Sequence, residues 1–138
     1  MVTKPPEADK ATQKGAAAFA TYFLAQLNSA YQTLDPSTID SLSKGSCVSC
    51  RAYARSLRRS SDLGERWVGG LTQVEQAVAS PIANGQSVVL VTYNSTDFTV
   101  YDRSGAVVDE QPAERRSTLQ VQVERRPNGW VVRELAQL

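Results

Sequence analysis

The Cys47-Val48-Ser49-Cys50 segment carries the clearest chemical signal in this sequence. Two cysteines three residues apart at the start of a helix can form a short disulfide bond, and the helix dipole lowers the pKa of such thiols. A thioredoxin-like redox site follows a strand, whereas a helical segment and Gly45 precede this motif. A zinc site would need two further cysteine or histidine ligands, which the sequence lacks. We therefore expect a structural disulfide, with two buried free thiols as the alternative. A disulfide would favour an exported protein.

The 138-residue sequence contains no histidine. Histidine is the side chain most often used for proton transfer near neutral pH and for binding transition metals. Its absence excludes Ser-His-Asp, Cys-His and histidine-metal sites. Four acidic residues near predicted turns form no recognisable metal loop, and we expect them on the surface: Asp97, Asp102, Asp109 and Glu110. The sequence therefore predicts no metal and no cofactor, identifies no catalytic residue and argues against catalysis.

Four arginines share one face of a predicted helix: Arg51, Arg55, Arg58 and Arg59. Four cations together could contact phosphates or lipid headgroups. The alternative is a solvated helix face, partly offset by Asp62 and Glu65. No aromatic platform accompanies the arginines, and the net charge of the chain is only +1. We expect the solvated face, and no binding of nucleic acid.

Several aromatic residues fall on predicted strands or on the first helix. Such amphipathic rings can line a ligand pocket, although they more often form part of a core. The candidate pocket residues are Tyr22, Trp67, Tyr93 and Trp130.

The elements that must position these residues change in type along the chain. Apolar residues at helical spacing predict helices at about 9–34, 36–43 and 46–63, the second capped by Asp35. After Gly64 the spacing changes to that of strands, with Val88–Val91 as a central strand that is apolar on both faces. Asn128-Gly129 predicts a type I′ hairpin turn, and Gly69-Gly70 a bulge or bend. The predicted strands are 66–79, 86–94, 97–102, 115–126 and 130–136.

These elements predict a single α+β domain at 9–138, preceded by a flexible linker or tether at 1–8. Helices followed by an antiparallel sheet must bury their apolar faces against one face of that sheet. We expect N-terminal helices packed on a curved sheet of four to five strands, which would form a cone with a pocket.

The order of these features resembles a family of uncharacterised actinobacterial lipoproteins, a domain of unknown function. The resemblance rests on the Thr12-to-Phe23 helix, the segment from Asn28 to Asp35, Ser46–Cys50 and the terminal Gly129-Trp130-x-Val132 strand. It implies an exported domain with a signal peptide and a lipid-modified cysteine, neither of which this sequence contains. The layout is also similar to the nuclear transport factor 2-like cone fold, which serves enzymes, small-molecule binders and interaction modules.

The resulting expectation is a non-catalytic, extracytoplasmic, membrane-anchored domain that binds a small molecule or an envelope protein and can form a homodimer. It would meet the membrane only through a lipid anchor absent from this chain. The alternative is an envelope thiol-disulfide redox protein that uses Cys47 and Cys50. A third class, a cone-fold enzyme that uses carboxylates alone, would need Asp or Glu in the cavity, and no predicted strand position clearly places one there.

Overall fold

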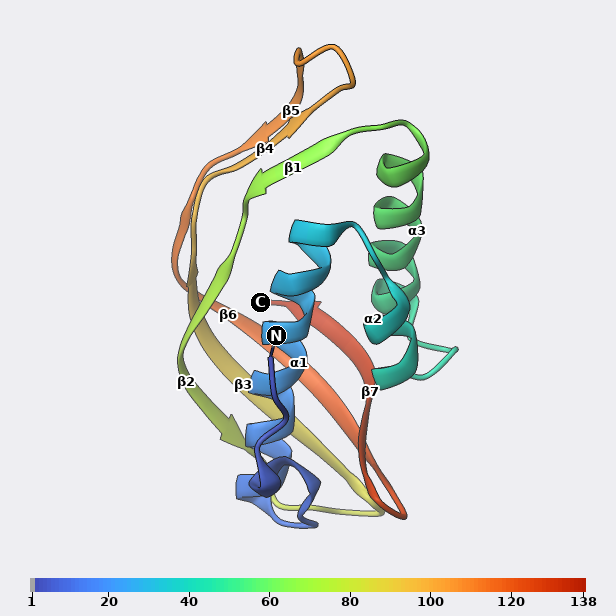
Figure 1. Ribbon diagram of the computed structural model, residues 1–138. Helices are drawn as coiled ribbons and strands as arrows, with labels where there is room; N and C mark the ends of the chain where they lie inside the picture. Colours follow the sequence, from blue (N-terminus) through green and yellow to red (C-terminus); the bar gives the residue numbers. More distant parts are fainter. Residues whose placement is uncertain (1) are drawn as a thin grey trace.

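The computed structural model describes residues 2–138 as helices packed on a strongly curved antiparallel sheet (Figure 1). A short 3-10 helix, η1, comes first, followed by three α-helices and seven strands. The helices are η1 (Pro6–Asp9), α1 (Gln13–Thr33), α2 (Ser37–Leu42) and α3 (Val48–Asp62). The strands are β1 (Arg66–Gly69), β2 (Thr72–Ala79), β3 (Gln86–Ser95), β4 (Phe98–Tyr101), β5 (Val107–Gln111), β6 (Glu114–Arg126) and β7 (Gly129–Gln137).

Helix α1 is the long helix against which the larger sheet packs. The Thr12 hydroxyl accepts a hydrogen bond from the backbone N–H of Gly15 and so caps its first turn. The helix ends at Leu34, which adopts a left-handed φ of 57°. Helix α2 begins at Ser37, one residue later than the sequence predicts, and its cap residue is Pro36 instead of Asp35. The Asp35 carboxylate accepts a hydrogen bond from the Ser37 N–H.

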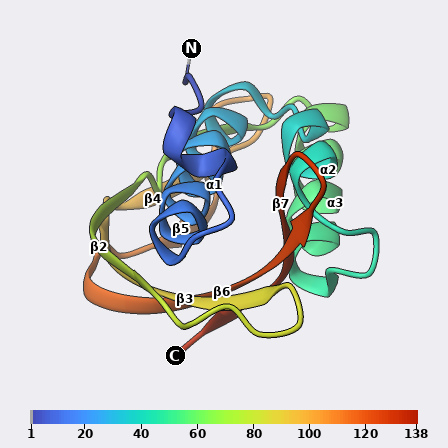
Figure 2. The same ribbon diagram turned by 90° about the horizontal axis from the view of Figure 1, so that it is seen from below.

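Two antiparallel sheets make up the curved layer. The larger has the order β2-β3-β6-β7, and the smaller has the order β1-β4-β5. The predicted strand at 66–79 is divided between them at Gly69 and Gly70, where both residues have positive φ and the chain bends sharply. Figure 2 shows the larger sheet curving around α1, with α2 and α3 beside β7. The predicted α+β cone is therefore confirmed.

The core lies between α1 and the concave face of the larger sheet. Phe19, Phe23 and Leu24 of α1 are buried at its centre. The alternation in β6 places Val121 and Val123 inside, as the sequence predicts. The fully buried side chains opposite the helix include Val89, Val91, Val121, Val123 and Val132.

Three local features differ from the sequence-based expectations. Strand β5 was not predicted, and all five of its residues are exposed, so no alternating pattern marks it. In β3, which is a central strand, Leu90 is 45% exposed, so only one face of Val88–Val91 is fully buried. The linker at 1–8 is ordered in part, because residues 6–8 belong to η1 and Ala8 is buried against the core.

The predicted type I′ turn is found at a different hairpin. Neither Asn128 nor Gly129 has a positive φ, whereas Asn84 and Gly85 have φ values of 53° and 71°. Asn84-Gly85 is therefore the pair with the left-handed conformation that this turn requires, between β2 and β3. In the β6–β7 hairpin the loop residues are Pro127 and Asn128, and proline fixes a negative φ at the first of them.

Candidate functional site

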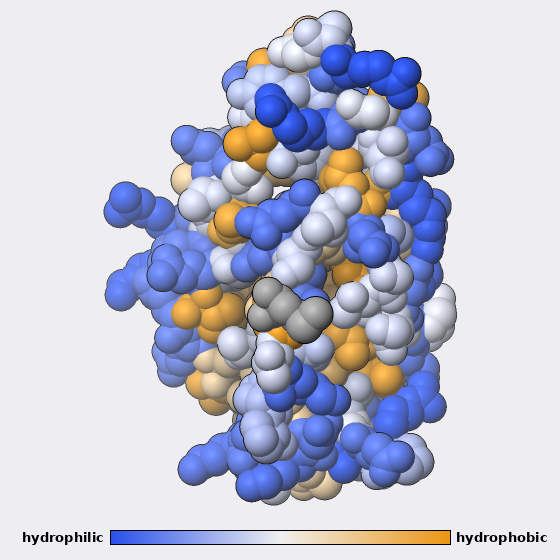
Figure 3. Space-filling model, viewed as in Figure 1, coloured by the Kyte–Doolittle hydropathy of each residue, from blue (hydrophilic) through white to orange (hydrophobic). Residues whose placement is uncertain are grey.

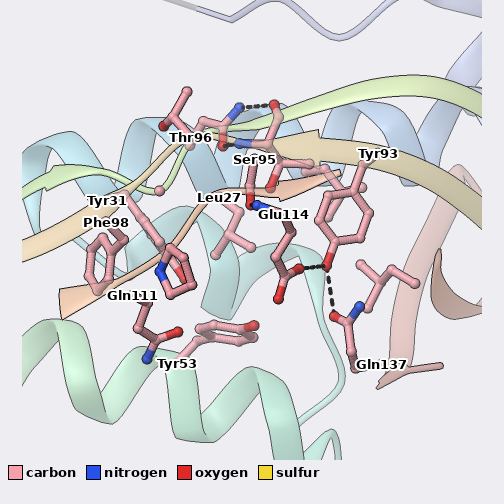
Figure 4. Close-up of a pocket in the computed structure, with 16 residues that line it drawn as sticks. Leu27, Tyr31, Tyr53, Tyr93, Ser95, Thr96, Phe98, Gln111, Glu114 and Gln137 are labelled. Carbon is pink, nitrogen blue, oxygen red and sulfur yellow. Dashed lines mark hydrogen bonds between the residues drawn. The ribbon is translucent and has the colours of Figure 1, made fainter. Parts of the chain in front are cut away.

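A cavity of about 340 Å³ opens between the second half of α1, helix α3 and the place where the two sheets meet (Figure 4). We call it the cleft. Its floor is apolar, formed by Leu24 and Leu27 of α1 and Leu119 of β6. Its mouth carries polar side chains, among them Gln111, Glu114 and Gln137, which are all exposed. The cleft can therefore hold a small molecule with an apolar body and a polar end.

Aromatic rings form one wall of the cleft. Tyr31 of α1 lies edge-on to Trp67, with ring centroids 4.9 Å apart, and Trp67 lies edge-on to Phe98 at 5.3 Å. Tyr53 of α3 faces Tyr31 at 6.4 Å. The four rings thus form a cluster from four different elements, α1, α3, β1 and β4, with Tyr31, Tyr53 and Phe98 exposing surface to the cleft.

The polar side of the cleft is organised around Tyr93. Its hydroxyl lies 2.9 Å from Oε2 of Glu114 and 2.8 Å from Oε1 of Gln137, as Figure 4 shows. Burial and the hydrogen bond to Glu114 raise the pKa of Tyr93 to about 12. The phenol therefore stays protonated near neutral pH and acts as a hydrogen-bond donor.

The other two tyrosines respond to the same environment. Burial raises the pKa of Tyr31, and the neighbouring Tyr53 and Tyr93 raise it further. Burial is also the main cause of the raised pKa of Tyr53, and the negative charge of Glu114 adds to it. The Glu114 carboxylate and the phenol groups of Tyr31, Tyr53 and Tyr93 therefore lie around the same cleft.

Strand pairing explains how Glu114 reaches the cleft. It is the first residue of β6 and pairs with Ser95 at the end of β3, beyond a register shift that begins at Tyr93. Its backbone N–H donates to the Ser95 hydroxyl at 3.3 Å. The expectation that no strand position puts a carboxylate in the cavity was thus wrong, because this register joins residues far apart in the sequence.

Among the four predicted pocket residues, only Tyr93 lines the cleft. Trp67 lies behind its aromatic wall and faces a second hollow between α3 and the smaller sheet. Tyr22 lines a third hollow between α1, the chain before it and β2. Trp130 is 4% exposed and donates from its indole N–H to the Lys10 carbonyl at 2.9 Å, so it serves the core. The structure does not bring these four residues into one site.

The four predicted arginines of α3 are divided by Asp40 of α2. Arg51 and Arg58 both form ion pairs with this carboxylate. Arg55 and Arg59 are exposed, and Arg59 lines the hollow between α3 and the smaller sheet. Two of the four guanidinium groups therefore hold α2 against α3 rather than facing a ligand.

The predicted disulfide between Cys47 and Cys50 is present, and both cysteines are fully buried. The carboxylate of Glu134, from β7, sits at the same helix start and accepts hydrogen bonds from the Val48 N–H at 2.9 Å and the Ser49 N–H at 3.1 Å. It also accepts from the Ser49 hydroxyl. The negative charge occupies the position where a thiolate would otherwise be stabilised by the helix.

Within residues 2–138, no three Cys, Asp or Glu side chains lie close enough to hold a metal ion together. Over the same residues, no helix has the length and apolar character needed to cross a membrane.

Comparison with known proteins places the chain by sequence and by fold. The model of a family of unknown function, DUF6318, matches residues 3–136. No curated protein matches the chain in sequence.

Several solved structures have a similar fold. The intermembrane space region of the chloroplast protein ARC6 is 11% identical, with a TM-score of 0.61 over 88% of this chain and 95% of that chain. An uncharacterised protein with a cystatin-like fold from Caulobacter vibrioides is 15% identical, with a TM-score of 0.54 over 90% and 91% of the two chains. At these identities the likeness concerns the fold alone.

Proposed function

The chain belongs to DUF6318, a family of unknown function, and we propose that this domain is a non-catalytic, extracytoplasmic protein that binds a small molecule in the cleft. The observation that carries the proposal is the composition of the cleft. An apolar floor, a wall of Tyr31, Tyr53 and Phe98, and a polar mouth around Tyr93 and Glu114 converge on one cavity of about 340 Å³. This combination is typical of small-molecule sites.

The extracytoplasmic location is supported by the disulfide. Cys47 and Cys50 are bonded, and stable disulfides persist in oxidising compartments. By resemblance, we extend the proposal to an actinobacterial lipoprotein whose anchor holds this domain at the outer face of the membrane.

A small molecule suits this surface better than a large protein partner. On the face seen in Figure 3, apolar patches are small and separated by polar side chains. Elsewhere, Val78 and Leu90 are exposed as a cross-strand pair on the sheet. Stable protein interfaces usually require a larger continuous surface.

The redox alternative is disfavoured by the surroundings of the two cysteines. A reactive thiol must be accessible and must be stabilised as a thiolate. Here both sulfurs are buried, and the Glu134 carboxylate lies 3.7 Å from Sγ of Cys47. A negative charge at this distance would oppose thiolate formation.

Acid-base catalysis is a second candidate, favoured by one observation. Glu114 and Tyr93 place a carboxylate and a phenol 2.9 Å apart at the mouth of the cleft. Turnover of a bound compound that is abolished by Glu114→Gln, with binding retained, would support this candidate.

The binding proposal can be tested with 2-phenylethanol, which has a ring for the apolar part of the cleft and a hydroxyl for its mouth. Titration followed by NMR should show binding, and Tyr53→Leu should weaken it at least about fivefold by removing a wall residue. The matched control is Tyr22→Leu, a half-buried tyrosine outside the cleft. Equal effects of the two substitutions, or no binding at millimolar concentrations, would overturn the proposal.

A further inference from the structure

We infer that the ligand of the cleft carries a positively charged amine, which Glu114 and the carbonyl oxygen of Gln137 receive at the mouth while an apolar body enters between the aromatic rings. This inference rests on the proposed function of the cleft and names the class of compound that it takes.

The charge of the cleft lining favours a cation over an anion. Among the described residues that line the cleft, Glu114 is the only one with a formal charge. No lysine or arginine belongs to this lining. A carboxylate or phosphate ligand would meet the Glu114 carboxylate without a cation to offset it, whereas an ammonium group would be attracted.

Two acceptor oxygens converge at the mouth of the cleft. The Tyr93 hydroxyl has one proton but faces two acceptors, Oε2 of Glu114 and Oε1 of Gln137. The Gln137 amide is oriented by its NH₂ group, which donates to the Thr118 carbonyl at 3.3 Å, so its oxygen points to Tyr93. One of the two acceptors therefore lacks this proton at any moment. An ammonium group brings three N–H donors and would satisfy the remaining oxygen.

Aromatic rings lie beside the Glu114 carboxylate. Figure 4 shows the Glu114 side chain between the rings of Tyr53 and Tyr93, which line the same cleft, and the Tyr93 hydroxyl lies 2.9 Å from its carboxylate. Aromatic faces attract cations at distances up to about 6 Å. A cation at the mouth would thus meet both a carboxylate and π-electron density.

The apolar floor defines the rest of the ligand. Leu27 and Leu119 lie below the polar mouth and offer no hydrogen-bonding side chain. A ligand that carries only charge, such as an inorganic cation, would leave this surface unused. The cleft therefore fits an amphipathic amine with a ring or branched apolar body.

The test compares three probes of similar shape and different charge: phenethylamine as the cation, 2-phenylethanol as the neutral compound and 3-phenylpropanoate as the anion. Affinities are measured at pH 7 by NMR titration of the full chain. We expect the amine to bind about tenfold more tightly than the alcohol, and the anion more weakly than either.

Glu114→Gln provides the second readout, because it is nearly isosteric and Glu114 is exposed, so folding should be retained. This variant should bind the amine and the alcohol within about twofold of each other. Glu110→Gln, on the neighbouring strand β5 and outside the cleft, is the matched control and should keep the preference for the amine.

The outcomes separate this inference from the proposed function. Equal affinity for the amine and the alcohol in the unmodified protein, or an unchanged preference in Glu114→Gln, would overturn the amine inference while leaving the cleft as a binding site. If the amine binds but Tyr53→Leu has no effect on it, binding occurs elsewhere, and both the inference and the proposed function fail.

Discussion

The side-chain amide of Asn28 and the backbone of Thr72 form two reciprocal hydrogen bonds. The Asn28 NH₂ group donates to the Thr72 carbonyl, and the Thr72 N–H donates to the Asn28 oxygen, each at 2.8 Å. Asn28 lies on α1, and Thr72 begins β2 just after the bend between the two sheets. The amide thereby holds the helix against the point where the curved layer changes direction, beside the cleft that both residues line.

Replacing Asn28 by Ala should lower the free energy of unfolding by about 2 kcal/mol, because two partly buried backbone groups lose their partners. Urea denaturation measures this change. Gln32→Ala, at an exposed position of the same helix, is the matched control and should change stability by less than about 0.5 kcal/mol. Similar values for the two variants would contradict this role of Asn28.

Gly69 should tolerate no side chain. Its φ is 77°, and a Cβ atom there would lie 1.9 Å from the carbonyl oxygen of Asp97. Gly69→Ala should therefore destabilise the domain by about 3 kcal/mol or more, by strain and by separating β1 from β4. At Gly45 a Cβ would meet nothing within 4 Å, so Gly45→Ala should be nearly neutral. A comparison of the melting temperatures tests both statements, and a neutral Gly69→Ala would contradict the first.

Glu134 should make stability depend on acid pH. Burial alone would raise its pKa, but hydrogen bonds from Ser49, Leu135 and Val48 lower it from 4.5 to about 2. A carboxyl group whose pKa is lower in the folded state contributes fully above the ordinary value. That contribution is lost as pH falls from about 4.5 toward 2.

Glu134→Gln should accordingly cost about 2 kcal/mol at pH 7 and much less at pH 2.5, because at the lower pH the carboxyl group is protonated in the unfolded chain, and keeping it ionised in the folded state then stabilises the fold little. Urea denaturation at the two pH values gives the comparison. Glu110→Gln, an exposed carboxylate on β5, should show no such pH dependence. A cost for Glu134→Gln that is equal at both pH values would refute the explanation.

The disulfide should stabilise the start of α3 without being essential to the fold. The bond between Cys47 and Cys50 closes a very short loop, so its removal should cost about 2 kcal/mol. In the unmodified protein the sulfur of Cys47 caps the start of α3. The combined variant Cys47→Ser and Cys50→Ala therefore removes the disulfide but keeps a capping side chain, because a serine hydroxyl can accept the same hydrogen bond. Urea denaturation should show a folded variant that dithiothreitol does not affect. Complete unfolding, or insulin reduction by the unmodified protein, would contradict this view.

The helices and most strands could be predicted because their signals are local. Thr12 and Leu34 bound a helix with regular apolar spacing, and β6 alternates apolar and polar residues. Strand β5 lacks such a signal because all its residues are exposed. At the β6–β7 hairpin, Pro127 overrides the preference of the following Asn-Gly pair.

The cleft could be predicted only in part. Tyr93 can be predicted as a pocket residue because it lies on a strand, whereas Tyr53 stands among arginines and cysteines whose local signals are stronger. Glu114 reaches the cleft through its pairing with Ser95, a long-range register that no local pattern specifies. Tryptophan is a residue type that often lines pockets, yet Trp130 is buried in the core, where its indole N–H donates a hydrogen bond to the Lys10 carbonyl.

Intermolecular nuclear Overhauser effects test most directly whether the cleft is the ligand site. With phenethylamine bound, we expect contacts from its ring protons to the methyl groups of Leu27 and Leu119 and to the Tyr53 ring, which line the cleft. Contacts confined to Tyr22 and Val74, in the hollow on the other side of α1, would contradict the claim.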